Sequence, residues 1–150
     1  MTVVATDGSC LQNPGGRSAW AWVRDDGVKA AGFIPAGTNQ IAELAAILEA
    51  LKAHRDVTDL TIESDSQYAI SCTTEWIHGW KRRGWKNSAG KAVKNQDLIR
   101  AIDAEMTARD TAPVFVKVKG HAAAGTHPMN EAADILAGET ARSGEDTVPA

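Results

Sequence analysis

Short apolar runs and an alternation of large and small residues along the first part of the chain predict β-strands. Three such segments lie between about residues 2 and 34, and Asp25-Asp26-Gly27 is typical of a hairpin turn between the second and the third. The pattern therefore predicts three antiparallel strands. Trp20 and Trp22 share one face of the second strand, where we expect them to pack in or beside the core.

The apolar spacing becomes helical after residue 38. Leucine and isoleucine residues form one stripe between Gln40 and His54, which predicts a helix. A short apolar run from Leu60 to Asp65 predicts a strand, and because a helix precedes it, we expect parallel pairing with the first sheet segment. Further helices are expected over about residues 66–76, from Leu98 onward and over 128–142, with a last strand over 113–118.

Length and composition favour a single soluble domain. The chain has 150 residues, a net charge of −3 and a hydrophobic fraction of 43%. Its two cysteines are too few for a disulfide scaffold, so a reducing cytoplasm is expected. No apolar run reaches the length of a membrane span, and the first residues do not resemble a signal peptide. We expect a cytoplasmic protein with one domain over residues 1–142 and a flexible tail over 143–150.

The average charge hides a basic segment. Residues 76–100 carry seven basic residues and one acid, a net charge of +6, so the rest of the chain carries −9. Trp76, Trp80 and Trp85 are interleaved with these charges. This pattern is typical of a surface that meets a polyanion and packs against its sugars. The alternative is an ordinary solvated charged face.

Two aspartates each follow an apolar strand. Asp7 ends the first strand and is followed by Gly8, which leaves room for a substrate backbone to come close, and Asp65 ends the strand after the helix. Glu43 lies at the border of the buried helical stripe, and Asp134 lies in the last helix. If the strands are neighbours, these four acids converge.

Converging carboxylates repel one another unless a cation lies between them, and oxygen ligands select hard ions such as Mg²⁺ or Mn²⁺ over Zn²⁺. Four acids can hold two metal ions, which together can hydrolyse a phosphodiester. Two other interpretations stay open at this point. A strand that ends in Asp-Gly is often a solvated turn, and four of 19 acidic residues can seem well placed by chance.

Five separate motifs resemble type I ribonuclease H, in order and spacing, over nearly the whole chain. They are Thr6-Asp7-Gly8-Ser9, Ala42-Glu43-Leu44, Ser64-Asp65-Ser66-Gln67-Tyr68, the stretch from Trp76 to Lys86, and Val118-Lys119-Gly120-His121 followed by Asn130-Glu131 to Asp134. The resemblance implies a ribonuclease H-like α/β fold with a mixed five-stranded sheet flanked by helices. It also implies a monomeric endonuclease that hydrolyses the RNA strand of RNA–DNA hybrids with two Mg²⁺ ions and leaves 3′-hydroxyl and 5′-phosphate ends.

The resemblance also implies residue roles. Asp7, Glu43, Asp65 and Asp134 would be catalytic metal ligands, and His121 would assist proton transfer or product departure. The positions that match substrate contacts are Gly8, Ser9, Cys10, Asn13, Thr38, Asn39 and Gln67, where Asn13 and Thr38 resemble a pocket for a DNA phosphate. In the basic protrusion, at about residues 76–94, the matching positions are Trp76, Trp80, Lys81, Arg82, Arg83, Trp85 and Lys86.

One loop departs from the family pattern. Between His121 and Asp134 the chain is a few residues longer than the common form and brings in a second histidine, His127. Because His127 precedes Pro128 at the expected helix start, we interpret it as a helix-entry residue.

Three other functions share features with this sequence. The same fold serves other polynucleotide hydrolases and transferases, from which the basic protrusion distinguishes this chain. A hybrid-binding module without catalysis would be expected to lack at least one of the four acids, and none is lacking. A response-regulator receiver domain also gathers aspartates at strand ends, but it would begin with alternating strands and helices instead of hairpins.

Overall fold

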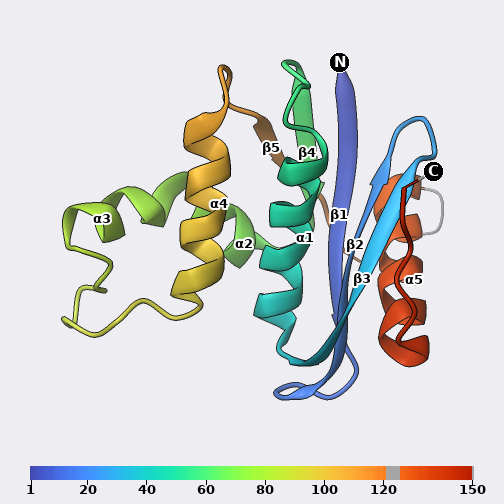
Figure 1. Ribbon diagram of the computed structural model, residues 1–150, viewed down its shortest axis with the longest axis horizontal. Coiled ribbons are helices and arrows are strands. Elements are labelled where there is room, and N and C mark those ends of the chain that lie inside the picture. The colour runs from blue at the N-terminus through green and yellow to red at the C-terminus, as the bar shows by residue number, and fades with distance from the viewer. Residues whose placement is uncertain (121–125, 150) are drawn as a thin grey trace.

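Five strands form one mixed sheet at the centre of the molecule (Figure 1). The computed structural model describes residues 1–120 and 126–149. The strands are β1 (Thr2–Cys10), β2 (Gly16–Arg24), β3 (Lys29–Gly37), β4 (Leu60–Ser64) and β5 (Val114–Lys117). They lie in the order β3-β2-β1-β4-β5, with antiparallel pairing among β1 to β3 and parallel pairing of β1 with β4 and of β4 with β5. The predicted mixed five-stranded sheet and its three antiparallel first strands are confirmed.

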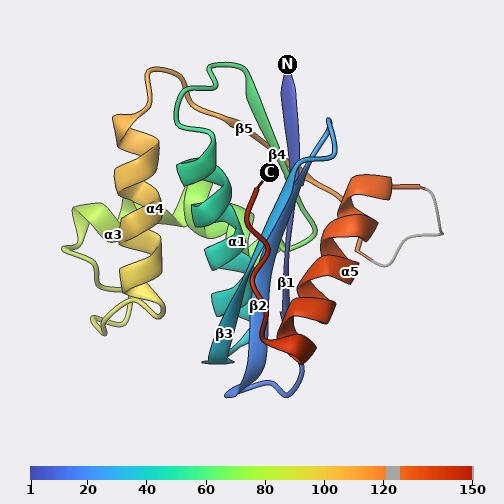
Figure 2. The same ribbon diagram turned by 45° about the vertical axis from the view of Figure 1, so that its right-hand side comes forward.

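Helices cover both faces of this sheet. They are α1 (Asn39–Ala53), α2 (Gln67–Ser71), the π-helical turn η1 (Cys72–Trp76), α3 (Ile77–Arg82), α4 (Gln96–Ala108) and α5 (Pro128–Ser143). Helix α1 lies on one face with α4 packed beside it, and α5 lies on the opposite face (Figures 1 and 2). Among the described residues, no helix is both long enough and apolar enough to cross a bilayer.

The two faces of the sheet are packed differently. On the α1 side, large aliphatic residues of the helices, such as Leu44 and Ile99, pack against Ile62 of β4 in the main core. On the α5 side the contacts are made largely by alanines, including Ala21 and Ala137, so the helix can lie close to the sheet. Trp22 is buried in the main core and Trp20 is half-buried beside it, as the alternation along β2 predicts.

The helix predicted over residues 66–76 divides into two parts. It begins as α2 and continues through η1, where a wider turn replaces the α-helical one. The hydroxyl of Thr73 donates to the carbonyl of Ala69, and that of Thr74 donates to the carbonyl of Ile70, at 2.8 Å each. Such bonds from Ser or Thr to the preceding turn compete with the backbone ladder and bend helices. The wider turn therefore sets the direction in which the chain enters α3.

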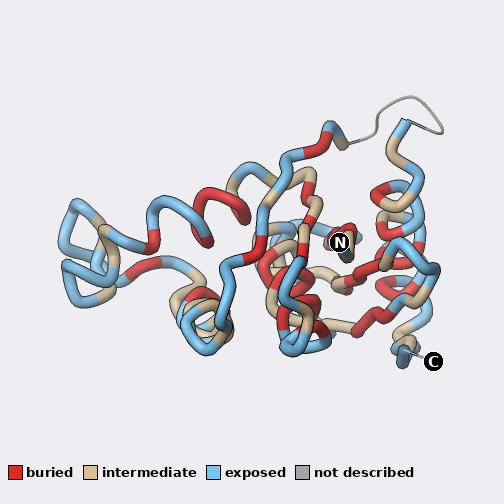
Figure 3. Tube along the Cα trace, turned by 90° about the horizontal axis from the view of Figure 1, so that it is seen from above, coloured by how far each residue is buried: buried red, intermediate tan, exposed pale blue. Residues whose placement is uncertain are grey.

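Helix α3 and the residues after it project beyond α4, away from the sheet (Figures 1 and 3). Most of this projection is exposed, and its attachment is made by a few buried side chains, including Ile77 and Val93. Asn95 has a left-handed conformation (φ 60°) directly before α4, and its amide donates to the hydroxyl of Tyr68 in α2 at 3.1 Å. The protrusion is thus attached at both of its ends.

The residues after α5 make contacts that the sequence did not predict. Thr147 exchanges two backbone hydrogen bonds with Ala31 of β3, at 2.9 and 3.0 Å. The carboxylate of Asp146 accepts the N–H of Phe33 at 2.7 Å. Asp146 and Thr147 therefore lie along the outer edge of β3, and the flexible tail over residues 143–150 stays a prediction.

His54 gives the fold a titrating group in its core. The ring is 1% exposed, packs edge-on against Trp22 at 4.8 Å and lies 2.7 Å from the carbonyl of Ala50 through Nδ1. Because a carbonyl only accepts, Nδ1 is the protonated nitrogen, and Nε2 is left facing the guanidinium of Arg24 at 3.4 Å. Burial lowers the pKa of His54, so the neutral ring is favoured in the folded state.

We predict that this ring makes the protein less stable in mild acid. The unfolded state binds a proton at a pKa of about 6.5, whereas folded His54 resists it, so stability is complete above that pH and falls below it. Urea unfolding at pH 7 and pH 5 should show a smaller loss for His54→Gln than for the unmodified protein. Equal losses in the two proteins would contradict the prediction.

Candidate active site

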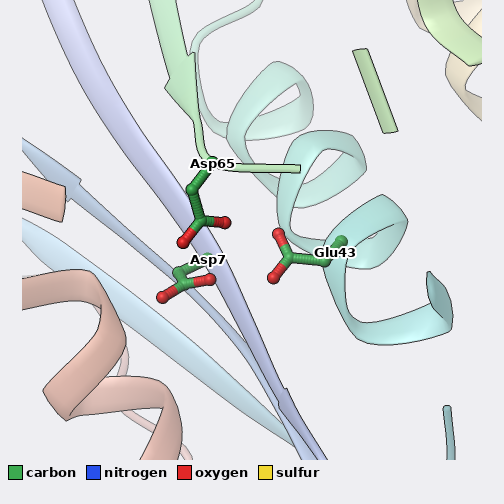
Figure 4. A group of neighbouring side chains, drawn as sticks. All are labelled: Asp7, Glu43 and Asp65. Atoms are coloured by element: carbon green, nitrogen blue, oxygen red, sulfur yellow. The ribbon is translucent and has the colours of Figure 1, made fainter. Parts of the chain in front are cut away.

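The pairing of β1 with β4 brings two aspartates side by side. In the parallel register Thr6 lies opposite Ser64, so the next residues, Asp7 and Asp65, lie at the same level. Strand β4 ends at Ser64, whereas β1 continues to Cys10 and pairs Asp7 with Ala21 of β2, so Asp7 lies within its strand and not at its end, where the sequence had placed it. Figure 4 shows their carboxylates facing one another. The two aspartates therefore converge as predicted, although only Asp65 follows the end of its strand.

Glu43 reaches this pair from α1, and Gly8 makes the approach possible. A Cβ atom at Gly8 would lie 2.5 to 2.6 Å from the backbone and side chain of Ala42 and the nitrogen of Glu43. The N–H of Gly8 donates to Asp7 at 2.9 Å and to Glu43 at 3.0 Å. The space beside Gly8 that the sequence assigned to a substrate backbone is thus filled, on this side, by α1.

Asp7, Glu43 and Asp65 form one compact acidic group. Each offers an oxygen such that all three atoms lie within 4.8 Å of one another. Asp7 is buried, and the other two are half-buried. Burial raises the pKa of Asp7 far above its usual range, and the negative charges of Glu43 and Asp65 raise it further. Burial also raises the pKa of Glu43. The group is therefore electrostatically unfavourable without a compensating positive charge.

A divalent cation fits this group. Oε2 of Glu43 is buried and has no hydrogen-bond partner among the described residues, so one carboxylate oxygen of the group is unsatisfied there. A buried acceptor without a partner costs free energy that a bound cation would recover. Because all the donors are carboxylate oxygens, the site suits Mg²⁺ or Mn²⁺ better than Zn²⁺.

The fourth predicted acid approaches from the other face. Asp134 is half-buried in α5, and its charge raises the pKa of both Asp7 and Glu43, so it lies within electrostatic reach of them. It is not part of the three-residue group whose oxygens lie within 4.8 Å. His127 directly precedes α5, as its helix-entry interpretation requires, and its carbonyl accepts the N–H of Glu131. His121 lies outside the described residues.

A polar pocket lies at the start of α1. Oδ1 of Asn13 accepts the N–H of Asn39 at 3.0 Å, and the hydroxyl of Thr38 caps the helix by accepting the N–H of Ile41 at 3.0 Å. A pocket of about 410 Å³ is lined by Asn13, Pro14, Thr38, Asn39, Gln40 and Lys94. The structure therefore brings together Asn13 and Thr38, the two residues that the sequence matched to a phosphate pocket.

The sequence did not single out two residues of this pocket. Lys94 brings a positive charge from the end of the basic protrusion, and Oε1 of Gln40 is buried with no hydrogen-bond partner in the described part of the chain. No local signal could have identified Lys94, because it is 54 positions from Gln40 in the sequence and meets it only through the packing of α4 against α1.

The other matched positions lie on either side of the acidic group. Ser9 and Cys10 are the last residues of β1, and both are half-exposed. The thiol of Cys10 lies 3.4 Å from the carbonyl of Gln12 and 3.7 Å from that of Gly37. Gln67 begins α2 and donates to the hydroxyl of Ser71 at 2.9 Å.

The basic protrusion contains both engaged and free cations. Lys81 forms an ion pair with Asp103 of α4 at 3.1 Å, and Arg83 donates to the carbonyl of Lys86 at 3.2 Å. Arg82 and the ammonium group of Lys86 are exposed and have no ion-pair partner among the described residues. Arg82 and Lys86 are therefore better placed than Lys81 and Arg83 to bind a polyanion.

The three tryptophans of the basic protrusion differ in how far they are exposed. Trp76 is 43% exposed and lies between Tyr68 and Trp80, with ring centroids 6.1 Å from each. Trp80 and Trp85 are half-buried against the main core, and the guanidinium of Arg100 lies 5.1 Å from the Trp85 ring. Trp76 therefore presents the most accessible ring of the three.

The acidic group predicts that Mg²⁺ stabilises the fold. An ion that binds only the folded protein raises the free energy of unfolding by roughly 2.7 kcal/mol at a hundred times its dissociation constant. Asp7→Asn should raise the melting temperature of the metal-free protein, because it removes repulsion, and should reduce the gain from Mg²⁺. Melting curves with EDTA and with millimolar Mg²⁺ measure both effects, and the absence of any Mg²⁺ response in the unmodified protein would contradict the prediction.

Comparison with known proteins agrees with this geometry. Residues 1–142 match the family model described as RNase H. Proteins named Ribonuclease H are similar to the chain. That of Tropheryma whipplei (strain Twist) is 44% identical over 94% of this chain and 84% of its own length. The protein of Salmonella arizonae is 43% identical over 89% of this chain and 84% of its own length. The protein of Anaeromyxobacter dehalogenans is 37% identical over 93% of this chain and 79% of its own length.

A solved structure is similar as well. The crystal structure of LC9-RNase H1, a type 1 RNase H with the type 2 active-site motif, has a TM-score of 0.81 and 25% identity over 99% of this chain and 77% of that one. The resemblance carried by the five sequence motifs is confirmed, and the chain belongs to the ribonuclease H family.

Proposed function

We propose that this protein hydrolyses the RNA strand of RNA–DNA hybrids and leaves 3′-hydroxyl and 5′-phosphate ends. The observation that carries the proposal is the group of Asp7, Glu43 and Asp65, whose oxygens lie within 4.8 Å of one another beside the half-buried Asp134. The membership of the ribonuclease H family and the names of the similar proteins support the same substrate.

Asp7, Glu43, Asp65 and Asp134 would hold two Mg²⁺ ions, for which Mn²⁺ can substitute. When bound, such a pair of ions lowers the pKa of water and stabilises the charge on the leaving oxygen of a phosphodiester. The role of the protein is to hold the carboxylates in place. Gly8 contributes by donating its N–H to two of them at once, at 2.9 and 3.0 Å.

The surfaces beside the acidic group suit the two strands of a hybrid. Ser9, Cys10 and Gln67 lie at the ends of β1 and α2, where they can meet the RNA strand, whose 2′-hydroxyl distinguishes it from DNA. The pocket of Asn13, Thr38 and Lys94 offers polar groups and one positive charge to a DNA phosphate.

The basic protrusion would bind the DNA strand. Arg82 and Lys86 present exposed positive charges, and Trp76 presents an accessible ring that can pack against a sugar. Lys81, Arg83, Trp80 and Trp85 would act less directly, because their contacts within the protein shape the protrusion. The monomeric state and the cytoplasmic location stay predictions.

The direct test is cleavage of a defined RNA–DNA hybrid with and without Mg²⁺. We expect products from the RNA strand only. Their 5′ ends should carry phosphate groups that a phosphatase removes. Double-stranded DNA and single-stranded RNA of the same sequence are the controls. Cleavage of the DNA strand, or equal cleavage of single-stranded RNA, would contradict the proposal.

We predict a ranking of activity among four variants. Asp7→Asn and Asp65→Asn each remove a negative charge from the acidic group, so cleavage should nearly vanish while hybrid binding persists. His121→Ala should retain slow cleavage, because a general acid or base typically contributes about a hundredfold to ten-thousandfold. His127→Ala should change little. Single-turnover cleavage at saturating Mg²⁺ measures the ranking, and a greater loss in a folded His127→Ala than in His121→Ala would reverse the histidine assignment.

We also predict that salt dependence separates the cations of the protrusion. Each lost phosphate contact lowers the slope of log affinity against log salt by about 0.9. Replacing Arg82 and Lys86 with alanine should therefore flatten the slope. Replacing Lys29 and Lys52, on β3 and α1, removes the same charge and should leave the slope unchanged. Hybrid binding over a salt series measures both, and equal slopes in the two double variants would refute a direct role for the protrusion.

A further inference from the structure

Gly120 lies where the chain leaves β5 and passes the carboxylate of Asp65. A Cβ atom at Gly120 would lie 2.7 Å from Oδ2 of Asp65 and 3.2 Å from both its Cβ and its Cγ. Non-bonded carbon atoms pack at about 3.5 to 4.0 Å, so these distances are too short for a side chain. Only a residue without a side chain fits against Asp65 in this conformation.

The backbone on both sides of this contact is fixed. Val118 is buried, and its N–H donates to the carbonyl of Ser64 at 2.9 Å, next to the ladder between β4 and β5. The hydroxyl of Ser64 accepts the N–H of Ser66 at 3.1 Å, and Ser66 in turn caps α2. A larger residue at position 120 would therefore displace the carboxylate of Asp65 more readily than either backbone segment.

Displacement of this carboxylate changes the acidic group directly. Asp65 contributes one of the three oxygens that lie within 4.8 Å of one another, and the other two come from Asp7 and Glu43. Asp7 is held by β1 and Glu43 by α1, and Gly8 bonds to both. A shift of Asp65 is therefore not followed by its neighbours, so the distances between the three carboxylates change.

We propose that Gly120 is a positioning residue, which sets the place of the Asp65 carboxylate relative to Asp7 and Glu43 and thereby the affinity of the group for a divalent cation. This inference rests on the proposed function, because it assumes that the carboxylates hold such a cation. It gives the Lys-Gly-His stretch a role that does not depend on its histidine.

The test is Gly120→Ala, with Mg²⁺ titrated against both melting temperature and single-turnover cleavage. Residues that orient metal ligands typically contribute about 10- to 100-fold to metal affinity, so the half-saturating Mg²⁺ concentration should rise by at least about tenfold. Cleavage should recover in part at high Mg²⁺, and hybrid binding without metal should be unchanged. The metal-free melting temperature should stay within about 2 °C of the unmodified protein, since the fold itself is retained.

Gly138→Ala is the matched control. The described side-chain atoms nearest to a Cβ atom at Gly138 would be those of the Arg142 guanidinium, at 3.4 Å and beyond, and that flexible side chain can move. Gly138 also lies in α5, one turn after Asp134, so this control tests whether any added methyl group near the site weakens the binding of Mg²⁺. It should leave the Mg²⁺ dependence unchanged.

A second comparison isolates the route through Asp65. In an Asp65→Asn background the ligand is already impaired, so adding Gly120→Ala should raise the half-saturating Mg²⁺ concentration no further. A full additional rise would overturn the proposal, because Gly120 would then act by another route. Loss of the metal-free fold in Gly120→Ala would also overturn it.

The outcomes separate this inference from the function on which it rests. An unmodified protein whose melting temperature and cleavage ignore Mg²⁺ contradicts the proposed function, and this inference falls with it. An unmodified protein that responds to Mg²⁺, together with a Gly120→Ala protein that responds identically, overturns the role of Gly120 alone.

Discussion

Carboxylates repel one another most strongly where water is excluded, and the centre of this protein holds three of them against that repulsion. Each comes from an element that is fixed elsewhere. Asp7 belongs to the central strand β1, Glu43 to α1, whose apolar stripe fills the main core, and Asp65 to the two-residue connection between β4 and α2. The buried apolar contacts of these elements supply the free energy that keeps the acids together before a cation neutralises them.

Backbone proximity is as important to this arrangement as the acids themselves. At Gly8 the absence of a side chain lets α1 lie directly on β1, and the N–H exposed there bonds to two carboxylates. The sequence marks Gly8 as a place of close approach, which is correct, but it does not identify the approaching partner. That partner is α1, which lies more than thirty residues after Gly8 in the sequence. Its approach depends on the angle at which α1 crosses β1, and this angle is not a local property of the sequence.

The parts of the site that follow from periodicity could be predicted. Asp65 follows the apolar run of β4, and the helical stripe placed Glu43 at its border, so both positions were predictable. Asp7 was found for a reason that is only partly correct, because β1 continues past it to Cys10. The contribution of Lys94 to the pocket with Asn13 was not predictable, because it depends on the packing of α4 against α1. The π-helical turn also escaped prediction, since it depends on which carbonyls the hydroxyls of Thr73 and Thr74 reach.

The segment after α5 shows how one border of the sheet is closed. Strand β3 is the outermost strand on its side, and such a strand offers unpaired N–H and C=O groups that another chain can join. Here Asp146 and Thr147 occupy the groups of Ala31 and Phe33. On the far border β5 has only four residues, so it offers a short template. Asp146 and Thr147 thus protect this edge against the addition of a strand from another molecule. A change that detached them would expose an aggregation-prone edge without altering the acidic group.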